Sequence, residues 1–400
     1  MAMDVCDLIV IGGGPAALAA AREAARAGLD VVMLHEAALS YSRRGLRVRG
    51  LRQVWSVGPG FRADALGPDG PEALTAPRLI AVHAPDDRVV PFPGCTLPGV
   101  AGLGAEAGWR VVLAGCGPAL VAAALRLGPA VLAVADLASP AEWLRDGQAA
   151  AFARLRRRGV LVLPRHTVMQ AAGDGAVRRV QLGPVDRYGR PAHGAPRWID
   201  TDALLVGHGP GALADITRLL RAAQRFGPAC AGWVPVTDPY GRTSVPGLFA
   251  VAARDGAVAG RLAGQAAASD AGRTALAPDL RRQRRRATPR PPGRFYPGLL
   301  ATIPPDTVIC PCEGIARRDI DAAVAAGASE INQLKQFTRL GMGECQGRHC
   351  LDVAAALLAA PSGAVPGCAT IRPPLRPVPL AALLGRFDYA DIPVPSHAPL

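Results

Sequence analysis

The sequence predicts an α/β protein. Short apolar strands alternate with alanine-rich helices, and the order strand, glycine-rich turn, helix, strand occurs twice, in residues 7–34 and 110–136. This alternation is typical of parallel sheets covered by helices. A chain of 400 residues, 50% of them hydrophobic, can bury more than one core, so we expect two or three domains.

The first of these units predicts a site for an adenine dinucleotide. Its turn fits the pattern G-x-G-x-x-G/A through Gly12, Gly14 and Ala17, with Pro15 at the first helical position. The first glycine makes the turn, the second lets a pyrophosphate approach the backbone, and the small third residue lets the helix pack on the strand. Glu36 follows the second strand, where a carboxylate accepts the ribose hydroxyls. A structural turn without a ligand is the alternative.

The second unit departs from that pattern. Gly115 and Gly117 are in place, but the third position is Leu120, whose bulk holds a helix off the strand, and Pro118 occupies the helix start. Asp136 stands where a ribose acid would. These features favour a structural Rossmann-like domain, with a working NAD site as the alternative.

Residues 111–138 are apolar enough to suggest a membrane span, but glycines and prolines divide them into strand, turn, helix and strand. We therefore expect no transmembrane segment, while docking on the surface of the inner membrane stays open. Residues 1–6 do not have the basic start of a secretory signal, so the sequence predicts a cytoplasmic protein.

The composition argues against nucleic-acid binding. The net charge of +13 comes from 44 arginines and one lysine that are spread along the chain, and only 4% of residues are aromatic. Residues 276–304 are rich in Arg and Pro and predict a linker, with a proline-rich, extended tail from 361 to 400.

Four of the nine cysteines lie in one segment and predict a metal site. They form the pairs Cys310-Pro-Cys312 and Cys345-Gln-Gly-Arg-His-Cys350. Four thiolates suit a [2Fe-2S] cluster or zinc, but structural zinc sites prefer two to four residues between paired cysteines. Nearby cations and glycine N–H groups favour an anionic cluster, so [2Fe-2S] is preferred over zinc or unligated thiols. The cations are Arg317, Arg318, Lys335, Arg339, Arg348 and His349.

Several motifs resemble one group of flavoprotein subunits. The cysteine segment, with Gln333-Leu-Lys335, resembles the bacterioferritin-associated-ferredoxin-like (BFD-like) [2Fe-2S] domain that closes these chains. The group comprises the A subunits of octopine and nopaline oxidases and related subunits of hydroxyproline and proline dehydrogenases and of hydrogen cyanide synthase. The other matching motifs are residues 54–55, 91–94, 97–100, 115–118, 241–249 and 372–379.

The resemblance implies a glutathione-reductase-like flavoprotein fold with two dinucleotide-binding domains and a small C-terminal BFD-like domain. Residues 1–109 and 226–275 would form the FAD-binding domain, residues 110–225 the second Rossmann-like domain, and residues 305–360 the [2Fe-2S] domain. The resemblance implies FAD at the first glycine turn and a cluster on the four clustered cysteines, and it leaves open an FMN at a subunit interface.

The implied FAD site differs from the family after one strand, among other places. A Gly-Asp pair should follow the strand that ends at Phe249, but Ala252-Ala253 stand there. Asp255 is the acid that would take over the hydrogen bond to the ribityl or phosphate groups.

The resemblance also implies a partner, a flavoprotein subunit of the amino-acid-oxidase type that oxidises an amine, and it leaves open a further small subunit. This chain would then be the electron-transfer subunit of a heteromeric amino-acid, imino-acid or opine dehydrogenase or oxidase. No side chain stands out as a general base, and the isolated histidines are expected to be structural. The alternatives are a structural subunit that has lost flavin chemistry and an NAD(P)H-dependent reductase that uses the second turn.

Overall fold

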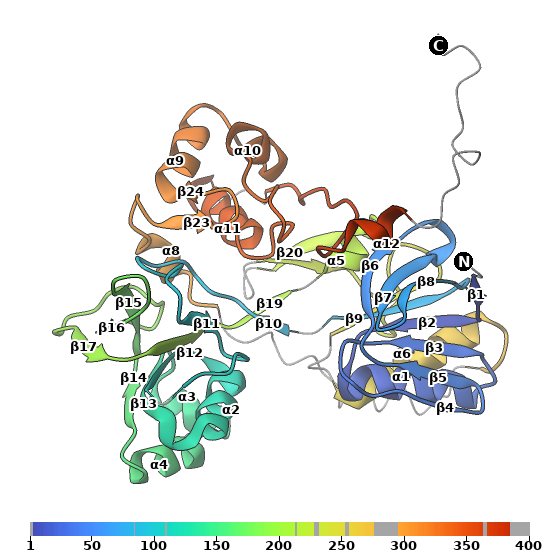
Figure 1. The fold of residues 1–400 in the computed structure, drawn as a ribbon, viewed down its shortest axis with the longest axis horizontal. Coiled ribbons are helices and arrows are strands. Elements are labelled where there is room, and N and C mark those ends of the chain that lie inside the picture. Colours follow the sequence, from blue (N-terminus) through green and yellow to red (C-terminus); the bar gives the residue numbers. More distant parts are fainter. Residues whose placement is uncertain are drawn as a thin grey trace.

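The computed structural model describes residues 3–83, 85–108, 110–212, 214–227, 232–252, 256–275, 295–362 and 366–384. Figure 1 shows a first domain around β2 and α1, a second domain around β12 and α2, and a C-terminal domain around α9, α10 and α11. The last segment of the described chain, which contains α12, extends from the C-terminal domain to the first domain (Figure 1).

The first domain is built on a six-stranded sheet in the order β22-β9-β2-β3-β5-β4. Neighbouring strands are parallel, except that β4 and β5 are antiparallel. The central strands are continuous apolar runs because both faces of a parallel sheet are buried. The strands are β2 (Leu8–Ile11), β3 (Val31–Leu34), β4 (Tyr41–Arg43), β5 (Leu46–Arg49), β9 (Leu79–His83) and β22 (Leu248–Ala252).

One face of this sheet is covered by α1 (Gly14–Arg26) and α6 (Gly256–Asp270). The two helices approach closely because Gly260 and Gly264 lie against the carbonyl oxygens of Ala16 and Ala20, where a Cβ atom would collide. The alanine-rich sequence of α1 therefore serves helix–helix packing as well as helix formation.

The other face packs on a four-stranded sheet in the order β1-β8-β7-β6, in which β1 and β8 are parallel and the other pairs antiparallel. Ile9 and Val32 of the central sheet meet Val54 and Leu74 of this sheet in one core. The elements are β1 (Asp4–Val5), β6 (Gln53–Val57), the 3-10 helix η1 (Pro59–Phe61), β7 (Ala63–Gly67) and β8 (Gly70–Thr75).

The second domain has a five-stranded parallel sheet in the order β11-β18-β12-β13-β14, with helices on one face and a three-stranded antiparallel sheet, β15-β16-β17, on the other. Its strands are β11 (Val100–Gly102), β12 (Val111–Gly115), β13 (Val131–Asp136), β14 (Leu161–Pro164), β15 (His166–Ala172), β16 (Arg179–Pro184), β17 (Arg197–Asp200) and β18 (Ala203–Gly207). Its helices are α2 (Gly117–Leu127), η2 (Gly128–Ala130), α3 (Pro140–Arg145) and α4 (Ala149–Arg157).

The chain passes between these domains twice, through the antiparallel pair β10 (Pro85–Asp87) and β19 (Pro210–Ala212). After β19 it re-enters the first domain, where Ile216, Leu219 and Leu220 of the region around α5 (Asp215–Leu219) pack into the core. The return therefore comes before residue 226, because these apolar side chains complete the first core. A hairpin of β20 (Gln224–Gly227) and β21 (Gly232–Pro235) follows.

The C-terminal domain packs on the second domain. Phe295 and Tyr296, at the end of the predicted linker, are buried with Leu137 and Val185, so residues 295–304 belong to a core; the arginine run at 281–286 lies outside the described residues. No helix in the described ranges is long and apolar enough to cross a membrane. The elements are α8 (Gly298–Ala301), β23 (Val308–Cys310), β24 (Ile315–Ala316), α9 (Arg317–Ala325), α10 (Ile331–Thr338), α11 (Leu351–Ser362) and α12 (Leu380–Leu384).

Candidate nucleotide and iron–sulfur sites

The first glycine turn joins β2 to α1. Gly12 has φ +121°, and a Cβ atom there would lie 2.5 Å from the carbonyl oxygen of Val82 on β9. Gly14 has φ +81°, and a Cβ atom there would have no described heavy atom within 4 Å. Pro15 lies in the first turn of α1, and Ala17 is fully buried. The first glycine is required by the sheet, and the second leaves room at a helix N-terminus, where backbone N–H groups favour a phosphate.

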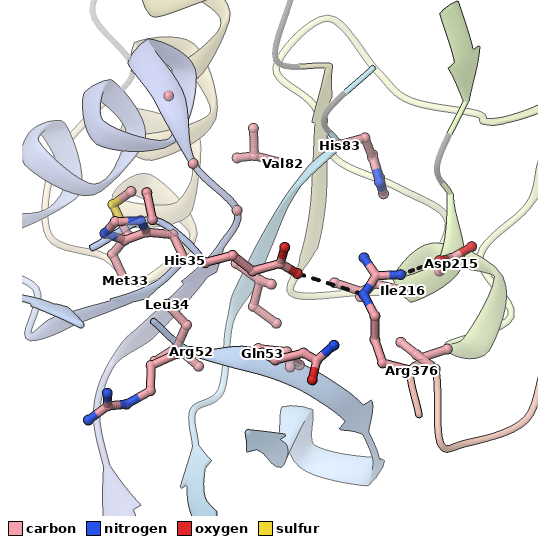
Figure 2. Close-up of a pocket in the computed structure, with 18 of the residues that line it drawn as sticks. Met33, Leu34, His35, Arg52, Gln53, Val82, His83, Asp215, Ile216 and Arg376 are labelled. Atoms are coloured by element: carbon pink, nitrogen blue, oxygen red, sulfur yellow. Dashed lines mark ion pairs between the residues drawn. The ribbon is translucent and has the colours of Figure 1, made fainter. Parts of the chain in front are cut away.

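A cavity of about 790 Å³ lies at this turn and falls within the roughly 300–1,000 Å³ usual for ligand pockets. Glu36, which follows β3, contributes to its wall with a side chain that is 67% exposed. Figure 2 shows that side chains from the first sheet, from α5 and from the C-terminal segment converge on this cavity. The sequence predicted the contribution of the first sheet. It did not predict Asp215 and Ile216 of α5, Arg348 of the cysteine segment, or Leu375 and Arg376 of the C-terminal segment.

The acid proposed on the flavin side is not placed by the structure. Asp255 lies outside the described residues and stays a prediction. Ala252, at the end of β22, pairs in register with His83 at the end of β9, and His83 and Val82 line the cavity. The region where the resemblance implied a Gly-Asp pair is therefore close to the cavity.

Asp136 of the second unit is used by the protein itself. Its carboxylate accepts hydrogen bonds of 2.9 Å from Trp143 Nε1 and 2.8 Å from the Ala138 backbone N–H, and it is fully buried. Leu120 is also fully buried, in the core between α2 and the sheet. These contacts support the structural interpretation of the second domain over an NAD site.

The buried Asp136 should make stability depend on pH. Burial raises its pKa from 3.8 to about 7, against the two N–H donors that lower it. Between these pH values the folded chain holds a proton that the unfolded chain has released, so the contribution of Asp136 to the free energy of unfolding falls as pH rises, by about 1.4 kcal/mol per pH unit, and levels off above pH 7. The buried His208, whose pKa is lowered from 6.5 to about 4, contributes in the opposite direction between these two values in both proteins. Denaturant unfolding of wild type and Asp136→Asn from pH 4 to 8 checks this, because the variant should lack this slope. Equal slopes in both proteins would contradict it.

Three histidines are held by protein groups. His35 Nε2 lies 2.7 Å from the Leu39 carbonyl oxygen, and His166 Nδ1 lies 2.8 Å from that of Pro164. His208 Nδ1 accepts a 3.0 Å hydrogen bond from a backbone N–H, and complete burial lowers the pKa of His208 to about 4. These contacts support a structural role for each of the three.

The structure arranges the four clustered cysteines as two pairs, Cys310 with Cys350 and Cys312 with Cys345. Cys310 ends β23 and is fully buried, as is Cys350 just before α11, whereas Cys345 is half-buried and Cys312 exposed. Cys310 is hydrogen-bonded to Cys350, and Cys312 interacts with Cys345. In the described part of the chain, no three His, Cys, Asp or Glu side chains are placed to hold one metal ion. Each iron of a [2Fe-2S] cluster takes two protein ligands, so two neighbouring pairs suit that cluster.

The backbone around Cys310 favours its thiolate. The hydrogen bond from Cys350 lowers the pKa of Cys310 to about 6, with the backbone N–H groups of Gly341 and Glu313 acting in the same direction and burial opposing them. Gly343 lies against the Cβ atom of Cys312, so a side chain at 343 would collide with that ligand candidate. The glycines of this segment thus provide N–H donors and close approach, as expected around an anionic cluster.

The cations of the segment are less available than the sequence suggested. Each arginine among them forms an ion pair with a carboxylate, which reduces its effect on an anionic cluster. The pairs are Arg317–Asp321 at 2.8 Å, Arg318–Asp306, Arg339–Glu313 at 2.9 Å and Arg348–Asp215 at 2.9 Å.

Arg348 connects the cysteine segment to the nucleotide cavity. It lies between Cys345 and Cys350 in the sequence, lines the cavity, and donates hydrogen bonds of 3.1 and 2.9 Å to Oδ2 of Asp215 on α5. The segment that carries two of the predicted ligands is therefore part of the cavity wall.

A triad of charged side chains, Asp352 with Arg88 and Arg218, also connects the C-terminal domain to the first domain. Asp352, in the first turn of α11, pairs with Arg88 at 2.9 Å and with Arg218 of α5 at 3.2 Å. Both arginine side chains are 6% exposed and the aspartate 17%. Arg88 directly follows β10, so the triad holds the crossing segment, the first domain and the C-terminal domain together.

Replacing Asp352 with asparagine should lower the free energy of unfolding by about 3 kcal/mol, because it leaves two buried guanidinium groups without their carboxylate. Denaturant unfolding of the full chain measures the change. Asp321→Asn is the control, because Asp321 is 53% exposed in its pair with Arg317 and its loss should cost about 0.5 kcal/mol or less. Similar losses in the two variants would mean that the triad does not hold the domains together.

Two family comparisons assign the cofactors. The FAD binding domain matches residues 7–42, which contain the first glycine turn and Glu36, and the BFD-like [2Fe-2S] binding domain matches residues 308–360, which contain the four cysteines. FAD and a [2Fe-2S] cluster are therefore cofactors of this chain, as predicted. No comparison bears on the FMN that the sequence left open.

Two solved structures confirm the fold class. L-proline dehydrogenase from P. horikoshii matches with a TM-score of 0.72 and 18% identity, over 96% of this chain and 80% of that chain. T. acidophilum thioredoxin reductase matches with a TM-score of 0.50 and 19% identity, over 67% of this chain and 99% of that chain. At these identities the likeness shows the fold alone, an α/β flavoprotein fold with an added C-terminal domain.

Curated relatives span nearly the whole chain. Hydrogen cyanide synthase subunit HcnB of Pseudomonas aeruginosa is 27% identical over 462 aligned positions, which cover 94% of this chain and 97% of that subunit. The A subunit of opine oxidase from Agrobacterium tumefaciens is 28% identical over 95% of this chain and 92% of that protein. The chain is thus a homologue of these oxidoreductase subunits, with an FAD-binding N-terminal segment and a C-terminal BFD-like [2Fe-2S] domain.

Proposed function

We propose that this chain is the electron-transfer subunit of a heteromeric FAD-dependent dehydrogenase or oxidase that acts on the CH–NH or CH–NH2 group of an amino acid, imino acid or opine. A partner flavoprotein subunit of the amino-acid-oxidase type would oxidise the substrate amine. This chain would receive the electrons and pass them through its [2Fe-2S] cluster to an acceptor. The names of the relatives, subunits of opine oxidase and hydrogen cyanide synthase, support a role inside such a complex.

The observation that carries this proposal is the shared wall of the two sites. Arg348 belongs to the segment between Cys345 and Cys350 and also lines the nucleotide cavity. A cluster held by this segment would therefore lie next to the domain that holds FAD.

The residues of the chain would divide the work between the two cofactors. The turn at Gly12 and Gly14 and the N-terminus of α1 would hold the pyrophosphate of FAD, and Glu36 would accept the ribose hydroxyls. When bound, FAD and the cluster supply the redox chemistry, which is theirs rather than that of any side chain. We propose Cys310, Cys312, Cys345 and Cys350 as the ligands of the cluster.

The burial of these four cysteines gives the cluster a protected and an exposed side. Cys310 and Cys350 are fully buried, whereas Cys312 is exposed. The side of Cys312 would therefore be the one that a redox partner can approach. Exposure also tunes the reduction potential of such clusters.

Anaerobic purification of this chain together with its partner subunit tests the proposal. After addition of the amine substrate, stopped-flow absorbance should show flavin bleaching, and freeze-quenched samples should show the EPR signal of a reduced [2Fe-2S] cluster. A preparation without flavin or cluster, or a cluster that the substrate never reduces, would refute the electron-transfer role.

A second candidate is a structural subunit of the same complex that keeps the nucleotide site but has lost flavin chemistry. Two observations favour it. Ala252 stands at the end of β22, where the resemblance implied a Gly-Asp pair that binds the flavin side. The alignment to HcnB spans 462 positions, so part of it has no counterpart in this 400-residue chain. Cofactor analysis of the complex decides between the two, because one reducible FAD per copy of this chain excludes the structural role.

A further inference from the structure

The C-terminal motif at residues 372–379 lies against the nucleotide cavity. The Leu375 backbone N–H donates a 2.6 Å hydrogen bond to the Trp55 carbonyl oxygen on β6, and the Leu375 carbonyl oxygen accepts one from Arg348. Leu375 itself is 3% exposed. The backbone beside Arg376 is therefore fixed, and this places its side chain in the cavity wall.

The cations that line the cavity differ in how they are engaged. Arg52 donates a 2.5 Å hydrogen bond to Glu72, and Arg348 donates one of 2.9 Å to Asp215. Arg376 instead lies 3.7 Å from a carboxylate oxygen of Glu36 and 3.7 Å from one of Asp215, both longer than a hydrogen bond. Figure 2 shows Arg376 in this position, with both ion pairs as dashed lines.

One of the two ion-pair partners of Arg376 is Glu36, the residue that the proposed function assigns to the ribose hydroxyls. The guanidinium of Arg376 lies between Glu36 and Asp215, on the cavity wall that also contains Gly12 and Gly14. A guanidinium offers five N–H donors in a planar fork that matches phosphate oxygens. The pyrophosphate of a dinucleotide brings two anionic phosphate groups to this turn.

From this juxtaposition we infer that Arg376 is a binding residue of the nucleotide site and contacts the phosphate groups of the bound dinucleotide. The inference rests on the proposed function, because it assumes that the cavity binds FAD. In the free chain Arg376 balances the charge of Glu36. In the bound chain the ribose hydroxyls donate to Glu36, and Arg376 pairs with phosphate. The site is thus completed by the C-terminal segment, which also contacts Arg348 of the cysteine segment.

This assignment predicts which part of a nucleotide Arg376 recognises. Arg376→Gln should weaken binding of FAD and ADP by about tenfold to a hundredfold, the effect of losing a hydrogen bond to a charged group, and should leave adenosine affinity unchanged. Glu36→Gln should weaken binding of all three, because all carry the ribose. Arg376→Lys should lie between wild type and Arg376→Gln for ADP, since it keeps the charge but not the fork.

The experiment is calorimetric titration of the flavin-depleted full chain alone, because the partner would add a flavin site of its own, with FAD, ADP and adenosine at one salt concentration. Arg372→Gln is the matched control, because Arg372 belongs to the same motif and is exposed outside the cavity wall. It should bind all three ligands as wild type does.

Two results would overturn the assignment. If Arg376→Gln binds ADP as tightly as wild type, Arg376 does not contact phosphate. If it loses adenosine and ADP equally, the residue only maintains the fold of the site. Failure of wild type to bind both FAD and ADP would overturn the nucleotide site itself, whereas either of the first two results leaves that site standing.

Discussion

A Cys310→Ala variant should be purified without a [2Fe-2S] cluster. Cys310 is fully buried at the end of β23, and its thiolate is favoured by backbone N–H groups. Loss of one of four thiolates leaves an iron without a ligand in a place that water does not reach, so the cluster should not persist. Visible absorbance, EPR of the reduced protein, and iron and sulfide content per chain measure the loss.

The loss should also weaken the C-terminal domain. Binding of a metal centre contributes to folding when its ligands are brought together only in the folded state. Here the ligands come from two segments, 310–312 and 345–350, on either side of α9 and α10. Limited proteolysis should therefore cut residues 308–360 of the variant faster than those of the wild type.

Cys368→Ala is the matched control for this variant. Cys368 is a half-buried thiol in the same part of the chain, and its Sγ donates only a long 3.9 Å contact to the Ala369 carbonyl oxygen. The control should keep the spectrum and the iron content of wild type. A cluster retained by Cys310→Ala, or lost equally in Cys368→Ala, would rule out the proposed ligand set.

Local patterns in the sequence predicted the parts of the fold that are governed by local rules. The strand, glycine turn, helix and strand expected in residues 7–34 correspond to β2, α1 and β3, because apolar runs and glycine positions define such units over a short stretch. The cysteine spacing likewise indicated [2Fe-2S], because ligand type and spacing belong to one short segment.

Contacts between distant residues could not be predicted in this way. The helix α5 lies in a stretch that looked like the end of the second domain, yet its apolar residues complete the first core. Asp215 and Arg348 are 133 residues apart, and nothing in either neighbourhood marks the other as a partner. The repeated Arg-Pro pattern at 372–379 was the one local sign that the C-terminal segment matters to the site.

The cations near the cysteines show a related limit. Arg317, Arg339 and Arg348 were expected to stabilise an anionic cluster, but each is paired with a carboxylate. A sequence shows which charges are near one another along the chain, while the structure decides which of them neutralise each other. The N–H groups of Gly341 and Glu313 remain the better-supported electrostatic contribution at Cys310.

A Gly12→Ala substitution should cost both stability and FAD. Gly12 has φ +121°, which L residues adopt only under strain, and the added Cβ atom would lie 2.5 Å from the Val82 carbonyl oxygen. The chain must move β9 or the turn to remove this contact, so we expect a loss of about 3 kcal/mol or more in the free energy of unfolding. The same movement displaces the N-terminus of α1, where the pyrophosphate would bind. Thermal unfolding and flavin content per chain measure the two effects.

Gly13→Ala separates this mechanism from a general sensitivity of the turn. Gly13 has φ −120°, which any residue adopts, and its added Cβ atom would lie 3.9 Å from that of His35, an ordinary contact. The control should therefore unfold as wild type does, although it shares the cavity wall with Gly12. If both variants unfold alike and both keep FAD, the close approach of Gly12 to Val82 has no energetic importance. If only Gly12→Ala is destabilised and loses flavin, the packing of the turn on β9 is what places α1 for the dinucleotide.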